Sequence, residues 1–189
     1  MSKIYPYLFV DTETTHLKSS IGEIIEICII QEFPTGKTVR FHSKFKPQHI
    51  ITADPQSLKI NGYCPKEWKN APPFSKHAEQ IHELLEFGII VGHNVNFDID
   101  YINTQLKACG LKKRISYLKI DTQTLCWEHL PLPSASMKFI RMFFGWSSKR
   151  AHTATKDTED CRRLFHILKR SSIFHRLWWK FKFRFLFSI

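Results

Sequence analysis

Residues 4–13 of the chain read Ile-Tyr-Pro-Tyr-Leu-Phe-Val-Asp-Thr-Glu, an apolar run that ends in two acidic residues. The run at 4–10 is rich in β-forming residues and predicts a buried strand, although Pro6 interrupts it. Asp11 and Glu13 follow, and side chains two residues apart on an extended backbone point to the same side. Both carboxylates can therefore face one site, as metal binding requires. A solvated strand end is the alternative interpretation.

The segments that follow continue the strand pattern and then alternate with helices. Residues 24–31 and 37–45 predict two more strands, which would form an antiparallel meander with the first. Residues 47–73 are rich in turn-forming residues and predict mostly loop with short helical pieces. The later expected elements are a helix from residue 75, strands at 89–91 and 117–120, and helices at 97–109, 136–144 and 155–169. About three to five strands mixed with about five helices indicate an α/β layered domain.

Composition restricts the class of protein and its partners. The chain has 189 residues with 28 Lys+Arg against 17 Asp+Glu, a formal charge of +11 that favours a polyanionic partner, either nucleic acid or an anionic membrane surface. The five cysteines stand singly, which predicts reduced thiols, a cytoplasmic location and no zinc site. The longest stretch without Asp, Glu, Lys or Arg is 11 residues, at 87–97, so we expect no transmembrane span. The N-terminus shows no secretory signal pattern.

The composition changes abruptly after residue 170. We therefore expect one domain at 1–170 and a basic, aromatic C-terminal tail at 171–189. From Trp178 to Phe187 basic residues alternate with phenylalanines, which on a strand would give one basic and one aromatic face. Such a tail could stack on single-stranded bases, dock on an anionic membrane surface or a protein partner, or add a packing element to the domain.

A second acidic candidate stands after the expected strand at 89–91. Asp98 would lie in the first turn of the helix at 97–109, where an aspartate commonly stabilises the helix N-terminus without any other role. Asp100 would project about 200° away around the helix axis, so only one of the two can face a site. Phe97, which is expected to pack inward, favours Asp98.

The third candidate is the segment His152-Thr-Ala-Thr-Lys-Asp157, at the start of the helix expected at 155–169. This spacing brings both side chains near one helix N-terminus, where Asp157 can be a metal ligand and His152 a general base. The chain has 10 histidines, so an incidental pair is the alternative. Asp160 competes with Asp157 for the ligand role.

In this order, FVDTETT at 9–15, GHNVNFD at 92–98 and HTATKD at 152–157 resemble the three exonuclease motifs of the DEDDh family of 3′-5′ exonucleases. That family includes the epsilon proofreading subunit of bacterial replicative polymerase, ribonuclease T, oligoribonuclease and the mammalian three-prime repair exonucleases. The resemblance covers about residues 5–169 and implies a ribonuclease-H-like fold, a mixed central sheet flanked by helices.

Carried over by position, the resemblance assigns four metal ligands and one general base. The ligands are Asp11, Glu13, Asp98 and Asp157, and the base is His152. The histidine subclass is implied by the final H-x-A-x-x-D pattern, because a tyrosine-type motif would place Tyr at Thr153. The implied cofactors are two divalent cations, Mg²⁺ or Mn²⁺. Four carboxylates approximately balance their charge, which would explain an acidic cluster inside a basic chain.

The resemblance also implies a pocket for the terminal nucleotide. Thr14, Thr15 and Leu17 are expected to line it. Many relatives carry a Glu and a His-Gly pair in the loop before the second motif, whereas this chain offers Gln56 and Asn61-Gly62. We therefore expect Asn61 in the substrate site, with a substrate preference that the motifs leave open.

The implied activity is metal-dependent 3′-5′ hydrolysis of phosphodiester bonds, releasing nucleoside 5′-monophosphates from single-stranded or frayed 3′ ends, with DNA favoured. One alternative is an RNA-trimming exoribonuclease, because the motifs carry the reaction and not the sugar preference. Another is a non-catalytic nucleic-acid-binding or polymerase-associated module, although all five catalytic positions are filled. Homodimers are frequent in the family, and nothing in this sequence selects that state.

Overall fold

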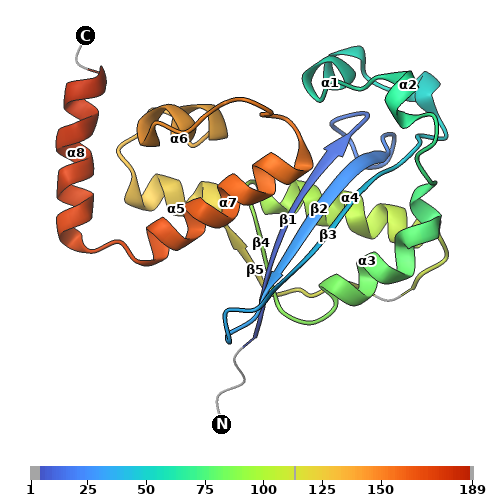
Figure 1. The fold of residues 1–189 in the computed structure, drawn as a ribbon, viewed down its shortest axis with the longest axis horizontal. Helices are drawn as coiled ribbons and strands as arrows, with labels where there is room; N and C mark the ends of the chain where they lie inside the picture. The colour runs from blue at the N-terminus through green and yellow to red at the C-terminus, as the bar shows by residue number, and fades with distance from the viewer. Residues whose placement is uncertain (1–4, 113, 188–189) are drawn as a thin grey trace.

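A five-stranded mixed sheet forms the centre of the computed structural model, which describes residues 5–112 and 114–187 (Figure 1). The strand order is β3-β2-β1-β4-β5. The first three strands, β1 (Tyr7–Thr14), β2 (Ile24–Glu32) and β3 (Thr38–Lys44), are antiparallel neighbours. The short strands β4 (Ile89–Gly92) and β5 (Lys119–Asp121) run parallel to β1. The predicted meander and the predicted α/β class are both confirmed.

β1 extends further than the sequence pattern predicted. We expected a strand that ends before Asp11, but pairing with β2 continues through Asp11↔Cys28 and Glu13↔Glu26 to Thr14↔Ile24. The β2 backbone thus holds the two acidic residues in an extended conformation. Their side chains share one face of the sheet because they are two residues apart.

Helices cover both faces of the sheet (Figure 1). On one face, α3 (Ala78–Leu85) and α4 (Val95–Ala108) pack against Leu8 and Val10 of β1. On the other face, α7 (Ala154–Lys169) packs Cys161 and Phe165 against Phe9 of β1. The alternation of β1 side chains between the two cores is the period-two pattern of a strand that is buried on both faces.

The remaining helices lie beside these layers. The loop region between β3 and β4 contains the short helices η1 (Ile50–Thr52), α1 (Pro55–Ile60), α2 (Pro65–Trp68) and η2 (Phe74–His77), as predicted. A third apolar cluster joins α7 to α5 (Thr122–His129), α6 (Met137–Phe144) and α8 (Ile173–Phe187). Within the described residues, no helix has the length and hydropathy needed to cross a membrane.

The tail does not form the extended segment that its alternation suggested. It forms α8, a 15-residue helix. Trp179 is only 3% exposed and packs with the partly buried Phe183 into the α5–α6–α7 cluster. These two aromatic side chains are four residues apart, so a helix presents both to the domain at once. A strand would have needed a free sheet edge for its backbone hydrogen bonds.

Candidate active site

Three of the four predicted metal ligands converge at the end of β1. Asp11 and Glu13 project from the strand, and Asp157 lies in the first turn of α7. Their carboxylate oxygens all lie within 4.8 Å of one another. The structure thus brings residues from opposite ends of the chain into one acidic cluster.

Asp98, the fourth predicted ligand, lies beside this cluster in the first turn of α4. Its side chain is buried, and Oδ1 accepts hydrogen bonds from Thr12 N at 2.9 Å and Thr12 Oγ1 at 2.8 Å. β4 pairs with β1 only as far as Phe9↔Val91, so Thr12 donates its N–H to Asp98 instead of to a strand. Asp100, two residues further on, is exposed, whereas Asp98 is buried beside the cluster.

Two polar contacts fix where α4 begins. Asn94, just before the helix, adopts a left-handed conformation with φ 68°, and its N–H donates to Asp121 Oδ1 at 3.0 Å. Thr122 Oγ1 donates to Gly92 O at 3.0 Å. These hydrogen bonds connect the end of β4 to the end of β5. They fix the position of the first turn of α4 and therefore the position of Asp98 beside the cluster.

The carboxylates are strongly perturbed by burial and by one another. Burial, followed by repulsion from Asp98, Asp157 and Glu13, raises the pKa of Asp11 well above its usual range. Burial and then repulsion from Asp157 raise the pKa of Glu13 to about 8. Burial raises the pKa of Asp98 to about 7, although its hydrogen bonds from Thr12 act in the opposite direction. Like charges packed in a low-dielectric site need a counter-charge, which a divalent cation can provide.

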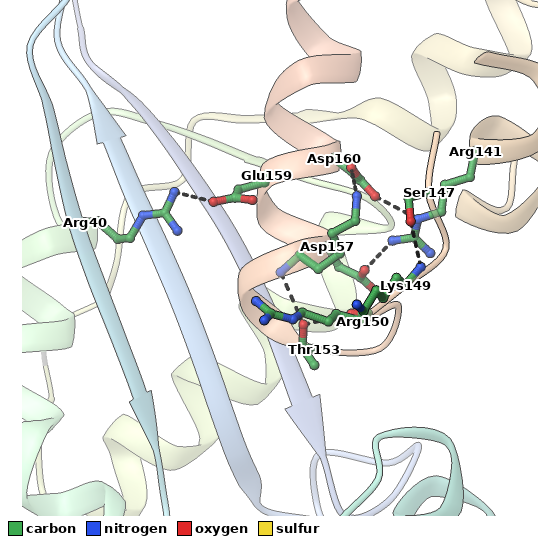
Figure 2. A network of polar contacts seen from close by, with 10 residues as sticks. Arg40, Arg141, Ser147, Lys149, Arg150, Thr153, Asp157, Glu159 and Asp160 are labelled. Carbon is green, nitrogen blue, oxygen red and sulfur yellow. Dashed lines mark hydrogen bonds and ion pairs between the residues drawn. The ribbon is translucent and has the colours of Figure 1, made fainter. Parts of the chain in front are cut away.

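Arg141 supplies one positive charge to this cluster from α6. Figure 2 shows its guanidinium reaching α7, where Nε donates to Asp160 Oδ2 at 2.7 Å and Nη2 donates to Asp157 Oδ1. Arg141 is only 2% exposed. Asp160 also accepts from Lys156 Nζ, so two cations engage its carboxylate. Asp157, rather than Asp160, is the residue that joins the acidic cluster.

The sequence interpretation missed Arg141, although a signal was present. It lies between Ile140 and Phe143, which are fully buried on the apolar face of α6. A charged residue on such a face needs a buried partner of opposite charge. Burial raises the pKa of Asp157 while the neighbouring guanidinium lowers it, so Arg141 keeps this one ligand easier to ionise than burial alone would allow.

His152 stands in the turn that leads into α7. Its backbone adopts φ 62°, a conformation uncommon outside glycine. Thr153 stabilises this turn, because its Oγ1 donates to Arg150 O at 2.9 Å and accepts from Lys156 N at 3.4 Å. The His152 side chain is exposed and lines a cavity of about 250 Å³ together with Asn61 and Gly62 of the α1–α2 turn.

The predicted nucleotide pocket residues lie around the turn after β1. Thr14 and Thr15 are buried, and the carbonyl of Thr14 accepts from Asn61 Nδ2 at 3.0 Å. Thr15 Oγ1 accepts from Glu23 N at 2.9 Å. Leu17 is 74% exposed on the same turn. Asn61 therefore joins the β1 turn to the cavity that His152 lines.

Glu26 is a further acidic residue that the sequence interpretation did not place in the site. It pairs with Glu13 across β1 and β2, is 3% exposed, and lines the His152 cavity. Its Oε1 lies 2.8 Å from His42 Nε2 on β3. The signal for it was a lone glutamate within the apolar run of β2, at a position that burial would otherwise disfavour.

The sequence and the fold can now be compared with known proteins. A family model described as exonuclease, RNase_T, matches residues 8–165. The chain belongs to the DEDDh-type family of 3′-5′ exonucleases. The match spans both faces of the sheet and all three motifs, so the family is assigned to the whole domain and the chain is a nuclease of the hydrolase class.

Curated relatives come from bacterial replication. The chain is 29% identical over 158 residues to the DNA polymerase III subunit epsilon of Treponema pallidum, covering 82% of this chain and 72% of that protein. It is 30% identical over 161 residues to the PolC-type DNA polymerase III of Thermotoga maritima, covering 84% of this chain and 11% of the relative. The chain therefore matches only a small part of the PolC-type polymerase.

Solved structures confirm the ribonuclease-H-like exonuclease fold. E. coli Exonuclease I in complex with a dT13 oligonucleotide superposes with a TM-score of 0.72 at 19% identity, covering 88% of this chain and 41% of that one. A 3′-exonuclease that recognises the histone mRNA stem-loop superposes with a TM-score of 0.64 at 14% identity, covering 89% of this chain and 84% of that one. At these identities the likeness establishes the fold alone.

The family implies dependence on divalent metal ions, and the donor set fits that requirement. Mg²⁺ and Mn²⁺ prefer oxygen ligands from carboxylates and water. Asp11, Glu13 and Asp157 present such oxygens in one cluster, and their mutual repulsion is relieved when a cation binds.

Proposed function

We propose that the chain removes nucleoside 5′-monophosphates from the 3′ end of DNA with two divalent cations and with His152 as the general base. The single observation that carries this proposal is the convergence of Asp11, Glu13 and Asp157 within 4.8 Å, next to Asp98. The proposed site residues are the ones that the motifs predicted. The cations supply a counter-charge for the phosphate and lower the pKa of water.

In this proposal the protein's own groups position the reactants. Asp11, Glu13, Asp98 and Asp157 hold the cations, and the rigid β1–β2 pairing fixes the first two. Arg141 orients the Asp157 carboxylate by occupying one of its oxygens. Thr14, Thr15, Leu17 and Asn61 are proposed to hold the terminal nucleotide.

His152 is proposed to take the proton from the attacking water. The ring nitrogen of a neutral imidazole can accept a proton from water, which is the usual role of a histidine as general base. Its position in the irregular turn before α7 leaves the ring free to approach from the solvent side, while Asp157 on the helix stays fixed. The His152 cavity would receive the nucleotide at the end that Asn61 lines.

DNA is the proposed substrate because the curated relatives are DNA polymerase III proteins by name and the Exonuclease I structure contains a dT13 oligonucleotide. The charge of +11 supports binding to a phosphate backbone. Association with a replicative polymerase is proposed on the same relatives. A homodimer stays a prediction. The free cysteines of the described chain agree with a cytoplasmic location, which is also proposed.

The test is an assay with 5′-labelled single-stranded DNA and RNA of the same sequence. We expect a ladder that shortens from the 3′ end of DNA in Mg²⁺, and no shortening in EDTA. Asp11→Ala is expected to lose at least about 10³-fold in rate. Asp100→Ala removes an exposed carboxylate two residues from Asp98 and is the matched control with wild-type activity.

A separate variant tests the general base. Removal of a general base typically costs about 10²–10⁴-fold in rate. We therefore expect His152→Ala to lose activity in that range while Mn²⁺ binding, measured by calorimetry, is retained. Wild-type turnover in His152→Ala would remove this residue from the role, and faster shortening of RNA than of DNA would support the exoribonuclease alternative. Metal-independent binding without products would support a binding module.

A further inference from the structure

The C-terminal helix α8 is anchored to the domain by one of its faces. Trp179 is buried and meets Phe144 of α6 edge-to-face, with ring centroids 6.0 Å apart. Lys182 Nζ donates to Phe143 O at 2.6 Å. Arg176 Nη2 lies 3.5 Å from His129 Nε2 on α5. These contacts define the inner face of the helix and fix its orientation on the protein.

The opposite face of α8 exposes a continuous apolar stripe. Five large side chains on it are between 56% and 77% exposed. They are Ile173, Phe174, Leu177, Trp178 and Phe181. On a helix of 3.6 residues per turn these positions span an arc of about 140°. A helix that is apolar on two opposite faces is normally covered on both, so the stripe requires a partner.

The charge around the stripe identifies the chemistry of that partner. α8 itself contains four Lys and Arg and no Asp or Glu. Lys180 is exposed at one border of the stripe, and Lys182 flanks Trp178 at the other, with Nζ 5.5 Å from the ring centroid. The stripe therefore fits a partner that is apolar inside and anionic at its surface.

An anionic lipid bilayer meets both requirements. A second copy of this face would oppose the same positive charges, which is unfavourable. Single-stranded nucleic acid offers no partner for the aliphatic side chains of Ile173 and Leu177, because stacking needs aromatic rings. Basic amphipathic helices with Trp, Phe and Leu on the apolar side lie in the plane of a membrane interface.

We propose that the outer face of α8 docks the exonuclease on the surface of an anionic membrane. The helix is about 22 Å long, too short and too charged to span a bilayer, so it would lie in the interface. α7 leads from the acidic cluster at its first turn to α8 at its other end, a distance of about 24 Å along its axis. Figure 1 shows α8 at the edge of the molecule, away from the end of β1. Docking therefore leaves the active site open to nucleic acid.

The test measures binding of the full chain to vesicles by co-sedimentation. The anionic vesicles contain about equal amounts of phosphatidylcholine and phosphatidylglycerol, and the neutral vesicles contain phosphatidylcholine alone. We expect the protein to bind the anionic vesicles at least about tenfold more tightly than the neutral ones. Raising the salt concentration should weaken binding without abolishing it. The triple variant Phe174→Ser, Leu177→Ser, Phe181→Ser should lose at least about tenfold in affinity for the anionic vesicles.

A matched control and an independent readout separate this proposal from misfolding. The control triple variant Ile51→Ser, Phe87→Ser, Tyr117→Ser removes exposed apolar groups elsewhere and should bind vesicles like the wild type. Both triple variants should keep wild-type activity on DNA in solution. Brominated lipids should quench Trp fluorescence on binding, and much less in Trp178→Phe.

Three results would overturn the proposal. They are equal binding of the wild type to neutral and anionic vesicles, unchanged vesicle binding by the α8 variant, and loss of vesicle binding in both triple variants alike. A specific acidic protein that binds the stripe while vesicles do not would replace the membrane as the partner. None of these results bears on whether the chain hydrolyses DNA, so the two proposals fail independently.

Discussion

Replacing Glu13 by Gln is expected to stabilise the metal-free protein at pH 8 while it abolishes hydrolysis. Glu13 lies in the acidic cluster, where burial and Asp157 raise its pKa from 4.5 to about 8. Glutamine keeps the shape of the side chain and removes the charge. The variant would therefore lose a ligand and also lose the repulsion that the cluster imposes on the folded state.

The direction of the pH dependence follows from proton linkage. Between pH 4.5 and about 8 the folded state keeps a proton on Glu13 that the unfolded state has released. The contribution of protonated Glu13 to the stability of the metal-free wild type is thus fully present below pH 4.5 and is lost as the pH rises through about 8. A displacement of this size corresponds to about 5 kcal/mol for Glu13 in isolation. Because neighbouring carboxylates share the repulsion, we expect the variant to gain about 2–4 kcal/mol at pH 8.

The assay is urea unfolding in EDTA at pH 5 and pH 8, followed by circular dichroism. The gain should nearly vanish at pH 5, where Glu13 of the wild type is protonated, and Mg²⁺ should reverse it at pH 8 because only the wild type keeps the full ligand set. Glu83→Gln, on the exposed side of α3, is the matched control and should change stability at neither pH. An equal gain at both pH values, or no gain at pH 8, would refute the reasoning.

Three other substitutions test the ion pairs of the site and the packing of the domain by urea unfolding. Arg141→Met leaves the buried Asp160 without its guanidinium partner and should lower the free energy of unfolding by about 3–5 kcal/mol. Mg²⁺ should restore part of this loss, because Asp157 also loses its contact with Arg141. A loss that Mg²⁺ does not change would contradict the link to the metal site. Gly88→Ala should lower the free energy of unfolding by about 1–3 kcal/mol, because φ is +147° and the new Cβ would lie 2.8 Å from Leu8 Cγ. An unchanged unfolding midpoint would count against this prediction. Phe143→Ala should cost about 3–5 kcal/mol and loosen α8, and an intact α8 protease-resistance profile would show that the helix is held by other contacts.

The local elements follow closely from the sequence, and the departures have identifiable causes. The runs of strand-forming residues and the turn residues between them predicted β2, β3 and β4. The pattern ended β1 too early because Asp11 and Glu13 are polar, whereas pairing with β2 continues through them. The alternation in the tail suggested an extended chain, but the packing of Trp179 and Phe183 on the domain stabilises a helix.

For the candidate site, too, some features could be predicted from the motifs and others only from the tertiary structure. The resemblance of the motifs predicted Asp11, Glu13, Asp98 and Asp157 as metal ligands, and the fold brings oxygens of the first two and of Asp157 within 4.8 Å of one another. Helix periodicity showed that only one of Asp98 and Asp100 can face the site, and the inward packing expected of Phe97 favoured Asp98. No local pattern could show that Arg141 binds Asp157, because the two residues lie on different helices.

The sequence by itself determined the fold class and the family and predicted the acidic residues of the site, because periodicity and the order of the motifs can be read along the chain. Only the tertiary structure shows that the pKa values of these carboxyls are raised, since a pKa depends on burial and on groups distant in sequence. It also decided that one face of α8 is anchored and the other exposed, since a helix with apolar residues on both faces gives no local signal of which face packs on the domain. The motifs thus predict which residues form the site, and the packing of the domain sets the pKa values of their side chains.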